Sequence, residues 1–326
     1  MTIELTHSRR EIDETELDLQ VIARFDAAEN VVVLTLSNSI DHPLPAWQPG
    51  AHLDITVGDG TTRQFSLCGD PSDTSRYEIA VLKVEDGRGG SAYVHSSLHV
   101  GARVHARNPR NHFRFDDSPG YLFIAGGIGI TPIVPMLKQA QERGADWRLI
   151  YCGRNESTMA FAEELAGYGN RVELWPSETR GRVDIARAFE QLGENVLVYC
   201  CGPARLLESV EEYTTGWAAG TVRTERFAAG ELTEPVRAEG FEIHLESSGL
   251  TFTVSPEESI LEVVENAGID VQSSCGDGTC GTCESAVLSG EPDHRDAVLT
   301  PEEQAANDCM MICVSRAKCA RLVLDL

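Results

Sequence analysis

Four cysteines toward the C-terminal end constrain this chain more than any other feature. Cys275, Cys280 and Cys283 follow a C-x4-C-x2-C spacing, and Cys313 lies well downstream. This spacing is typical of plant-type [2Fe–2S] ligation, in which three thiolates come from one loop and the fourth from elsewhere. A zinc site would more naturally use two closely spaced cysteine pairs, and disulfides are not expected in a chain without a secretory segment. The sequence therefore predicts a [2Fe–2S] cluster.

Glycines separate the first three cysteines. Gly276, Gly278 and Gly281 lie between them, and glycine adopts left-handed backbone angles without steric cost. We expect the loop to curl through these residues and to direct backbone N–H groups toward the cysteine sulfurs.

The composition is that of a globular protein with more than one domain. A chain of 326 residues predicts two or three domains. It is 42% hydrophobic and 24% charged, and no apolar stretch has the length of a signal peptide or a membrane span. Ten cysteines without a secretion signal favour a reducing compartment, so we expect the protein in the cytoplasm.

The negative charge limits the partners of the protein. The net charge of −24 argues against binding to nucleic acid or to anionic membrane surfaces. Residues 240–326 carry 16 Asp and Glu against 4 Lys and Arg. This acidic excess has two interpretations: a solubilising surface, or a docking face for a basic redox partner.

The first third of the chain is rich in short β-type runs broken by Gly, Pro and Asp. These runs cover residues 31–36, 52–57, 77–83 and 100–104. Regularly spaced short strands of this kind predict an antiparallel β-barrel.

From residue 121 onward the pattern changes to alternating strands and helices. Apolar runs at 121–125, 148–152 and 195–200 alternate with helical patterns such as 131–143 and 158–167. This alternation predicts an α/β domain with a parallel sheet.

The remaining segments surround the cluster motif. Residues 228–237 have few periodic apolar positions and resemble a linker. Beyond them, 241–245 and 250–254 predict a hairpin and 259–267 predicts a helix.

A glycine-rich turn joins the first predicted parallel strand to its helix. It covers residues 126–132, and the next two strands also end in glycine-bearing loops, at 151–154 and 199–203. Glycines in such turns often serve packing alone. Three such loops at the carboxyl ends of parallel strands favour a dinucleotide site. Its candidate residues are Gly126, Gly127, Gly129, Thr131, Pro132, Arg154, Cys201, Gly202 and Pro203.

The predicted barrel contains a second pair of motifs that could hold a cofactor. Arg63 offers a bidentate partner for phosphate, Phe65 a surface for a flat ring, and Ser66 a hydrogen bond to a heteroatom. The turn at 87–91 is rich in N–H groups. An edge strand with a surface arginine and a core phenylalanine would explain the same residues, and the sequence alone leaves both interpretations open. The candidate set is Arg63, Gln64, Phe65, Ser66, Leu67, Gly89, Gly90 and Ser91.

Taken in order, these motifs resemble the phthalate dioxygenase reductase family, which includes vanillate O-demethylase reductase subunits and belongs to the ferredoxin-NADP reductase superfamily. The motifs that carry the resemblance lie at 63–67, 87–91, 126–132, 201–203 and 275–283. The resemblance implies an FMN-binding barrel domain at 1–116, an NADH-binding domain at 117–228, a linker at 229–239, and an α+β (β-grasp) ferredoxin domain at 240–326.

The resemblance also implies roles for individual residues. The candidates of the barrel would hold the flavin, and those of the parallel sheet would line the nicotinamide site. Phe227 matches an aromatic residue that resembling proteins stack on the flavin. Ser66, Thr131, Cys201 and Phe227 are the residues predicted at the reacting centre. The aromatic residue of the flavin strand is commonly Tyr in the superfamily, whereas this chain has Phe65.

The cofactor identities rest mostly on the resemblance. The turn at 87–91 could hold the phosphate of FMN or of FAD, and the resemblance favours FMN. Glu156 disfavours the 2′-phosphate of NADPH whereas Arg154 could favour it. NADH is the predicted donor, with NADPH as the alternative.

These inferences predict a monomeric electron carrier. Electrons would pass from NADH through FMN and the [2Fe–2S] cluster to a terminal oxygenase of the Rieske type. A reductase for a cytochrome P450 is the second interpretation. A cluster-bearing redox sensor without turnover is a third, of another class, and the complete set of flavin and nucleotide loops argues against it.

Overall fold

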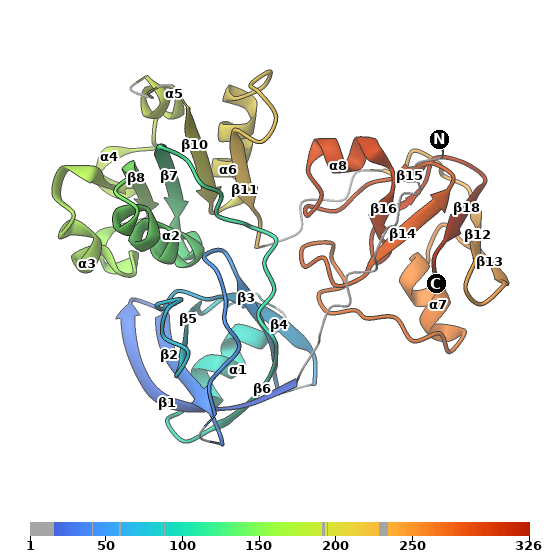
Figure 1. The fold of residues 1–326 in the computed structure, drawn as a ribbon, viewed down its shortest axis with the longest axis horizontal. Helices are drawn as coiled ribbons and strands as arrows, with labels where there is room; N and C mark the ends of the chain where they lie inside the picture. The colour runs from blue at the N-terminus through green and yellow to red at the C-terminus, as the bar shows by residue number, and fades with distance from the viewer. Residues whose placement is uncertain are drawn as a thin grey trace, which may run out of the picture.

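The computed structural model describes residues 16–40, 42–58, 60–85, 87, 89–190, 193, 195–227 and 234–326. Figure 1 shows three units: two adjoin each other, and the C-terminal unit lies to one side of them. No helix among these residues combines the length and apolar character needed to cross a membrane.

The first unit is built on an antiparallel sheet of six strands in the order β4-β3-β6-β1-β2-β5. The strands are β1 (Glu16–Ala28), β2 (Val31–Asn38), β3 (His52–Thr56), β4 (Thr62–Ser66), β5 (Tyr77–Leu82) and β6 (Arg103–Arg107). Alternate side chains from these strands form one apolar core, against which Val94 of α1 (Gly90–Ser97) also packs. Leu19, Leu34 and Leu53 of this core have no exposed surface.

The predicted antiparallel β-barrel is not confirmed in detail. Strands β4 and β5 lie at opposite edges of this sheet and, in the described part of the chain, are not paired with each other. Just beyond β4, Leu67 forms an isolated bridge with Ile79 of β5, and the N–H of Cys68 donates to the carbonyl oxygen of Glu78 at 2.9 Å. Strand β4 has five residues and ends at Ser66, so the chain meets β5 only beyond the end of the strand. The strand expected at 100–104 begins instead at Arg103, because Gly101 adopts a left-handed backbone (φ 92°) in the preceding turn.

The second unit has the predicted parallel sheet, in the order β11-β10-β7-β8-β9. Its strands are β7 (Gly120–Gly126), β8 (Asp146–Gly153), β9 (Val172–Pro176), β10 (Val196–Cys201) and β11 (Val222–Glu225). The helices are α2 (Ile130–Glu142), α3 (Ala162–Ala166), α4 (Ser177–Arg180), α5 (Ile185–Phe189) and α6 (Ala204–Tyr213), with 3-10 turns η1 (Gly127–Gly129), η2 (Glu156–Thr158) and η3 (Gly169–Arg171). The chain proceeds from β7 in one direction to β9 and then returns to β10 on the other side. The carboxyl ends of β7 and β10 therefore flank the switch point where ligands bind in such sheets.

One helix of this unit is shorter than its sequence pattern predicted. The pattern covers 158–167, but only Ala162–Ala166 is α-helical. Phe161 adopts a left-handed backbone (φ 61°) at the residue before α3. A right-handed helix cannot run through that conformation.

The first two units share an apolar cluster. Val31, Val33 and Ala80 of the first sheet pack with Ala160, and Ile128 of the glycine-rich turn adjoins them. The backbone N–H of Glu29 also donates to the carbonyl oxygen of Ser157 at 2.8 Å. The carboxyl ends of β7 and β8 are thereby held against the antiparallel sheet.

The C-terminal unit contains a mixed sheet of five strands in the order β13-β12-β18-β14-β16. Its strands are β12 (Phe241–Leu245), β13 (Leu250–Val254), β14 (Glu284–Ser289), β16 (Cys309–Met311) and β18 (Arg321–Leu324), and β15 (Pro292–Asp293) pairs with β17 (Arg316–Ala317). The predicted hairpin is the antiparallel pair β12–β13. The predicted helix is α7 (Ile260–Asn266), which begins with a capping box formed by Ser259 and Glu262. Helix α8 (Pro301–Ala306) precedes β16.

The predicted linker falls partly outside the described residues. Residues 229–233 and the boundary at 228 belong to the part that is not described, whereas 234–239 contain no helix or strand. The N–H of Val236 donates to a carboxylate oxygen of the buried Asp293 at 3.0 Å. This end of the connection is therefore attached to the C-terminal unit.

Candidate functional site

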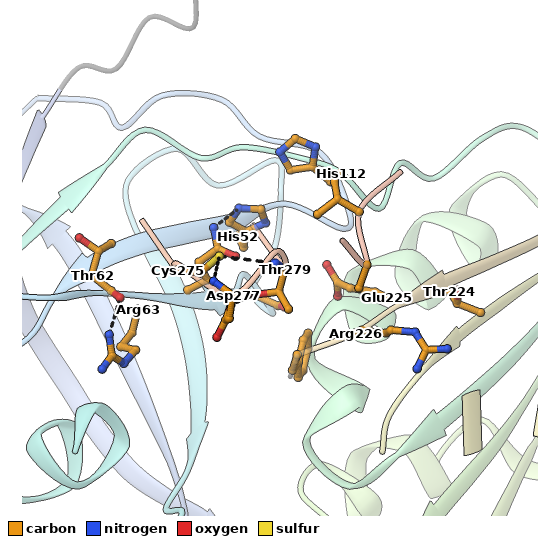
Figure 2. Close-up of a pocket in the computed structure, with 15 residues that line it drawn as sticks. His52, Thr62, Arg63, His112, Thr224, Glu225, Arg226, Cys275, Asp277 and Thr279 are labelled. Carbon is orange, nitrogen blue, oxygen red and sulfur yellow. Dashed lines mark hydrogen bonds between the residues drawn. The ribbon is translucent and has the colours of Figure 1, made fainter. Parts of the chain in front are cut away.

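All three units meet at one pocket. Figure 2 shows Cys275, Asp277 and Thr279 beside His52 and Arg63, with Glu225 and Arg226 nearby. The lining residues are His52, Thr62, Arg63, Gln64, Ser66, His112, Thr224, Glu225, Arg226, Phe227, Cys275, Asp277, Thr279, Ala297 and Val298. Predicted flavin residues, the predicted stacking aromatic and a predicted cluster ligand therefore surround one space.

The four cysteines of the motif form one connected group. The thiol of Cys275 is hydrogen-bonded with those of Cys280 and Cys313, and Cys283 is hydrogen-bonded with Cys313. These contacts lower the pKa of Cys275, chiefly through Cys280, and that of Cys283, chiefly through Cys313. They raise the pKa of Cys280 and Cys313, in both cases chiefly through Cys275. Cys280, Cys283 and Cys313 are buried, and Cys275 is half-buried.

The loop between these cysteines directs N–H groups at sulfur, as predicted. Asp277 and Thr279 each donate a backbone N–H to Cys275 Sγ at 3.4 Å, and Thr282 donates to Cys280 Sγ at 3.4 Å. Gly278 has a left-handed backbone (φ 74°), and a Cβ there would lie 2.5 Å from a methyl carbon of Val314. Thiolates gain stability from such donors.

The donor set of this loop can be compared with the needs of an iron–sulfur cluster. The four thiols are linked by contacts between pairs. Four sulfurs with N–H donors in a buried loop fit a cluster whose ligands are divided between two irons.

The flavin-strand motif and the later glycine turn come together in space. Gly90 is buried at the start of α1, and a Cβ there would lie 2.6 Å from Cγ of Arg63. Arg63 therefore lies across the N-terminal end of this helix, with Gly89 (φ 82°) as the preceding residue. A guanidinium beside free helical N–H groups fits a phosphate. The hydroxyl of Ser91 accepts the N–H of Val84 at 3.0 Å.

The other residues of the motif differ in their surroundings. Gln64 and the buried Ser66 line the pocket. Phe65 is half-buried against the core of the first unit, and Leu67 lies within that core. Neither Phe65 nor Leu67 lines the pocket. Alternate residues of this segment therefore face the pocket and the core of the first unit.

Most glycines of the predicted nucleotide loops have a packing reason. A Cβ at Gly129 would lie 2.3 Å from the carbonyl oxygen of Cys201. A Cβ at Gly126 would lie 2.6 Å from Cδ of Pro203, and one at Gly202 would lie 3.0 Å from Gly126 Cα. Gly127 differs, because it has a left-handed backbone (φ 54°) and open space around its Cβ position. The close packing brings the carboxyl ends of β7 and β10 together, and Gly127 is the position where a ligand can approach the backbone.

Thr131 and Pro132 lie at the start of α2, as predicted. Both are buried. The Thr131 hydroxyl donates to the carbonyl oxygen of Ile128 at 2.9 Å, so it fastens the glycine-rich turn to the helix.

Cys201 and Glu225 form a polar pair at the ends of β10 and β11. Cys201 has no exposed surface, and its thiol donates to Oε2 of Glu225 at 3.7 Å. Burial raises the pKa of Glu225 to about 8, although the hydrogen bond from Cys201 acts in the opposite direction. Burial and then Glu225 also raise the pKa of Cys201. Glu225 is therefore largely protonated at neutral pH, and it lines the common pocket.

Arg154 follows β8 and forms an ion pair. Its Nε lies 2.9 Å from Oε1 of Glu178, and the side-chain amide of Asn155 donates to Oε2 of the same carboxylate at 3.2 Å. The acid that pairs with Arg154 is Glu178 of α4, the helix that follows β9, rather than Glu156, which the sequence placed beside it. These residues lie just beyond the carboxyl ends of β8 and β9.

The sequence patterns did not single out several residues of the pocket. Among these are His52, His112 and Glu225. Glu225 is part of the Glu-Arg-Phe run that ends at Phe227. Its closeness in sequence to the predicted aromatic residue could therefore have indicated that it lies at the site. The two histidines belong to no recognisable motif. Only the packing of β3 against the segment after β6 brings them to the site.

Two family models match this chain. The model described as a 2Fe-2S iron-sulfur cluster binding domain matches residues 243–318. The model described as an oxidoreductase NAD-binding domain matches residues 123–212. They match the C-terminal unit and the parallel-sheet unit, respectively.

Relatives match almost the whole chain. Phthalate dioxygenase reductase of Burkholderia cepacia is 38% identical over 316 residues, which are 95% of this chain and 97% of the relative. A solved structure titled as phthalate dioxygenase reductase, a modular structure for electron transfer from pyridine nucleotides to [2Fe-2S], is 37% identical. It has a TM-score of 0.70 and covers 95% of this chain and 98% of that one.

A longer protein also matches. An intact type IV self-sufficient cytochrome P450 monooxygenase is 41% identical, with a TM-score of 0.89 over 95% of this chain. This chain spans 41% of the length of that P450 chain. The cysteine motif, the shared pocket and the near full-length matches lead to one conclusion: the chain belongs to the phthalate dioxygenase reductase family.

Proposed function

We propose that this protein is the NADH-dependent reductase component of an oxygenase system and contains FMN and a [2Fe–2S] cluster. The pocket shared by Arg63, Ser66, Phe227 and Cys275 carries this proposal, because it places candidate residues for both groups around one space. When these groups are bound, the flavin accepts a hydride from NADH and the cluster passes electrons on singly. The protein supplies the positions of the reacting groups.

On the flavin side, the residues of the first unit bind and orient. Arg63 and the N-terminal end of α1 hold the phosphate, and Ser66 offers its hydroxyl to the ring system from a buried position. Phe227 is 45% exposed and lines the pocket, so its ring is available to stack on the flavin. In this proposal the six-stranded sheet is the FMN domain, curled into a barrel that closes near the Leu67–Ile79 bridge.

On the nucleotide side, the residues of the switch point bind and orient. Gly127 admits the pyrophosphate to the start of α2, and Thr131 holds the turn in shape. Cys201 and Glu225 lie where the nicotinamide would meet the flavin. Because Glu225 is largely protonated at neutral pH, the pair adds little negative charge beside the hydride donor.

The donor in this proposal is NADH. Arg154 is already paired with Glu178, so a 2′-phosphate on the adenosine ribose would meet a carboxylate rather than an unpaired cation. The 2′-hydroxyl of NADH is uncharged. It can accept a hydrogen bond from Arg154 or donate one to Glu178 without electrostatic repulsion.

The acceptor in this proposal is the terminal component of a Rieske-type oxygenase. A cytochrome P450 is the second candidate, and the 0.89 TM-score against a chain that contains a P450 favours it. We further propose domain limits of 1–116, 117–228 and 240–326, with a linker at 229–239 and a β-grasp fold for the last domain. We also propose that the protein is a monomer and lies in the cytoplasm. None of the ten cysteines forms a disulfide, which suits a reducing compartment.

Anaerobic titration of the purified protein with NADH tests the proposal. Absorbance and EPR would follow the flavin and the cluster. We expect bleaching of both groups and a [2Fe–2S] signal. Bound flavin and cluster that stay oxidised with both NADH and NADPH would refute the proposal, and reduction by NADPH alone would refute the choice of donor.

A further inference from the structure

Two stacked histidines lie between the flavin strand and the cluster loop. His52 begins β3 and pairs with Ser66 across the sheet. Its backbone N–H donates to Arg110 at 2.9 Å and its carbonyl accepts from Arg110 at 3.1 Å, which places His112 close by. The two rings are stacked, with centroids 5.9 Å apart and planes at 22°.

The first unit holds His52 rigidly. The Gln64 amide nitrogen lies 3.1 Å from His52 Nε2 and also donates to Asp54 Oδ1 at 2.9 Å. Because an amide nitrogen can only donate, His52 Nε2 accepts and the ring proton is on Nδ1. Asp54 is buried and forms an ion pair with Arg110. Burial lowers the pKa of His52 to about 3, so this ring is a neutral and fixed platform.

His112 contacts the cluster loop from the other side of this platform. Gly281 lies between Cys280 and Cys283, and a Cβ there would lie 2.7 Å from Cε1 and Nε2 of His112. Gly281 is buried, whereas His112 is exposed as a residue. The ring is therefore seated directly on the peptide that joins two of the candidate ligands.

This contact joins parts that no local sequence pattern connects. His52 comes from the strand beside Ser66, His112 from the segment leading to the parallel sheet, and Gly281 from the C-terminal unit. Cys275 lines the same pocket as both histidines. The orientation of the cluster loop toward the flavin strand thus depends on how closely Gly281 approaches His112.

We propose that His112, supported by His52, is a positioning residue that seats the cluster loop against the flavin site for electron transfer between them. The proposal rests on the proposed function and adds a residue to it. Each hydride brings two electrons and one proton to the flavin. With flavin and cluster bound, the two electrons would leave singly through the cluster to the acceptor protein, and the proton would return to solvent.

The test compares His112→Ala with the unaltered protein, both loaded with flavin and cluster, by anaerobic stopped-flow mixing with NADH. We expect the rate of cluster reduction, relative to that of flavin bleaching, to fall severalfold, because the rate of electron transfer between two groups decreases steeply as the distance between them grows. His112→Phe keeps a ring against Gly281, so it restores most of the rate. His105→Ala is the matched control, because His105 lies on β6 in an exposed ion pair with Asp18 and should leave both phases unchanged.

Several outcomes would overturn the proposal. An unchanged ratio in His112→Ala, or an equal fall in His105→Ala, would show that the contact does not control the transfer. A fall in His112→Phe as large as in His112→Ala would show that packing against Gly281 is not the cause. Should His112→Ala fail to bind the cluster, His112→Gln is measured in its place, and we expect its cluster reduction to be measurably slower than that of the unaltered protein.

A second route of reduction separates this proposal from the proposed function. Photoreduction of the flavin with light and a sacrificial amine needs no NADH. A slowed passage from flavin to cluster in His112→Ala under light would support the positioning role even if NADH reduced neither protein. Equal passage in both proteins under light would overturn it.

Discussion

The ion pair between Arg154 and Glu178 predicts which nicotinamide cofactor the protein prefers. Replacing Glu178 by Gln removes the carboxylate that neutralises Arg154 and keeps the shape of the side chain. The pair is exposed, with 79% and 47% of the two side chains accessible, so its charges act through largely aqueous surroundings. A unit charge pair at about 4 Å is then worth about 1 kcal/mol, within the range of about 0.2–1 kcal/mol for exposed ion pairs.

Two effects of this size act together on NADPH. The substitution removes the negative charge of Glu178, which repels the 2′-phosphate, and it leaves the Arg154 guanidinium without its ion-pair partner. Together the two effects should strengthen the binding of NADPH by about 1–2 kcal/mol. The ratio of kcat/KM for NADPH to that for NADH should therefore rise about 5- to 30-fold in Glu178→Gln.

Steady-state kinetics with a small artificial acceptor would measure this ratio. Glu173→Gln is the matched control, because Glu173, near the start of β9, forms a comparable ion pair with Arg180 of α4 at 2.7 Å. An unchanged ratio in Glu178→Gln, or the same rise in Glu173→Gln, would refute the reasoning.

Four other predictions follow from the same geometry. Cys280→Ser should lose the cluster signal in EPR while NADH still bleaches the flavin; loss of both would contradict separate flavin and cluster sites. Gly129→Ala should cost about 1–3 kcal/mol by overpacking and lower Tm by at least about 2 °C, because its Cβ would lie 2.3 Å from the Cys201 carbonyl; an unchanged Tm would refute the packing role. Glu225 has a pKa raised to about 8, so the folded state holds a proton that the unfolded state releases near pH 4.5, and stability should fall as pH rises between those values. Denaturant titrations from pH 4.5 to 9 should show a flatter profile in Glu225→Gln, and identical profiles would contradict the shift. Finally, if the acidic C-terminal unit docks a basic acceptor, turnover with that protein should fall with salt while turnover with a small neutral quinone stays nearly constant; equal responses would refute docking by charge.

Local sequence patterns predicted the elements that depend on neighbouring residues. The run from Cys275 to Cys283 predicted a curled loop with N–H groups directed at sulfur, and the hydrogen bonds to Cys275 and Cys280 confirm it. The strand–turn–helix at 120–142 formed where the glycines and Pro132 indicated. In each case the determining groups lie within a few residues of one another.

The structure differs from the sequence-based predictions where a contact between distant segments, or the backbone conformation of a single residue, determines the fold. Closure of the predicted barrel is limited to the contacts around the Leu67–Ile79 bridge, because β4 ends at Ser66, before it could pair with β5 along its length. The helix expected at 158–167 lost its first turns to the left-handed backbone of Phe161. Periodicity of apolar residues contains no signal for either feature.

The sequence by itself determined the parallel sheet with its glycine turns and the membership of the family, and it predicted the four cysteine ligands of the cluster, because spacing along the chain controls each of these. Only the tertiary structure decided that Gly281 rests on His112, that Arg154 pairs with Glu178, and that Cys201 meets Glu225. These contacts join residues from different strands or units. The order of strands and the packing of the units determine them, and neither is encoded in the spacing of neighbouring residues.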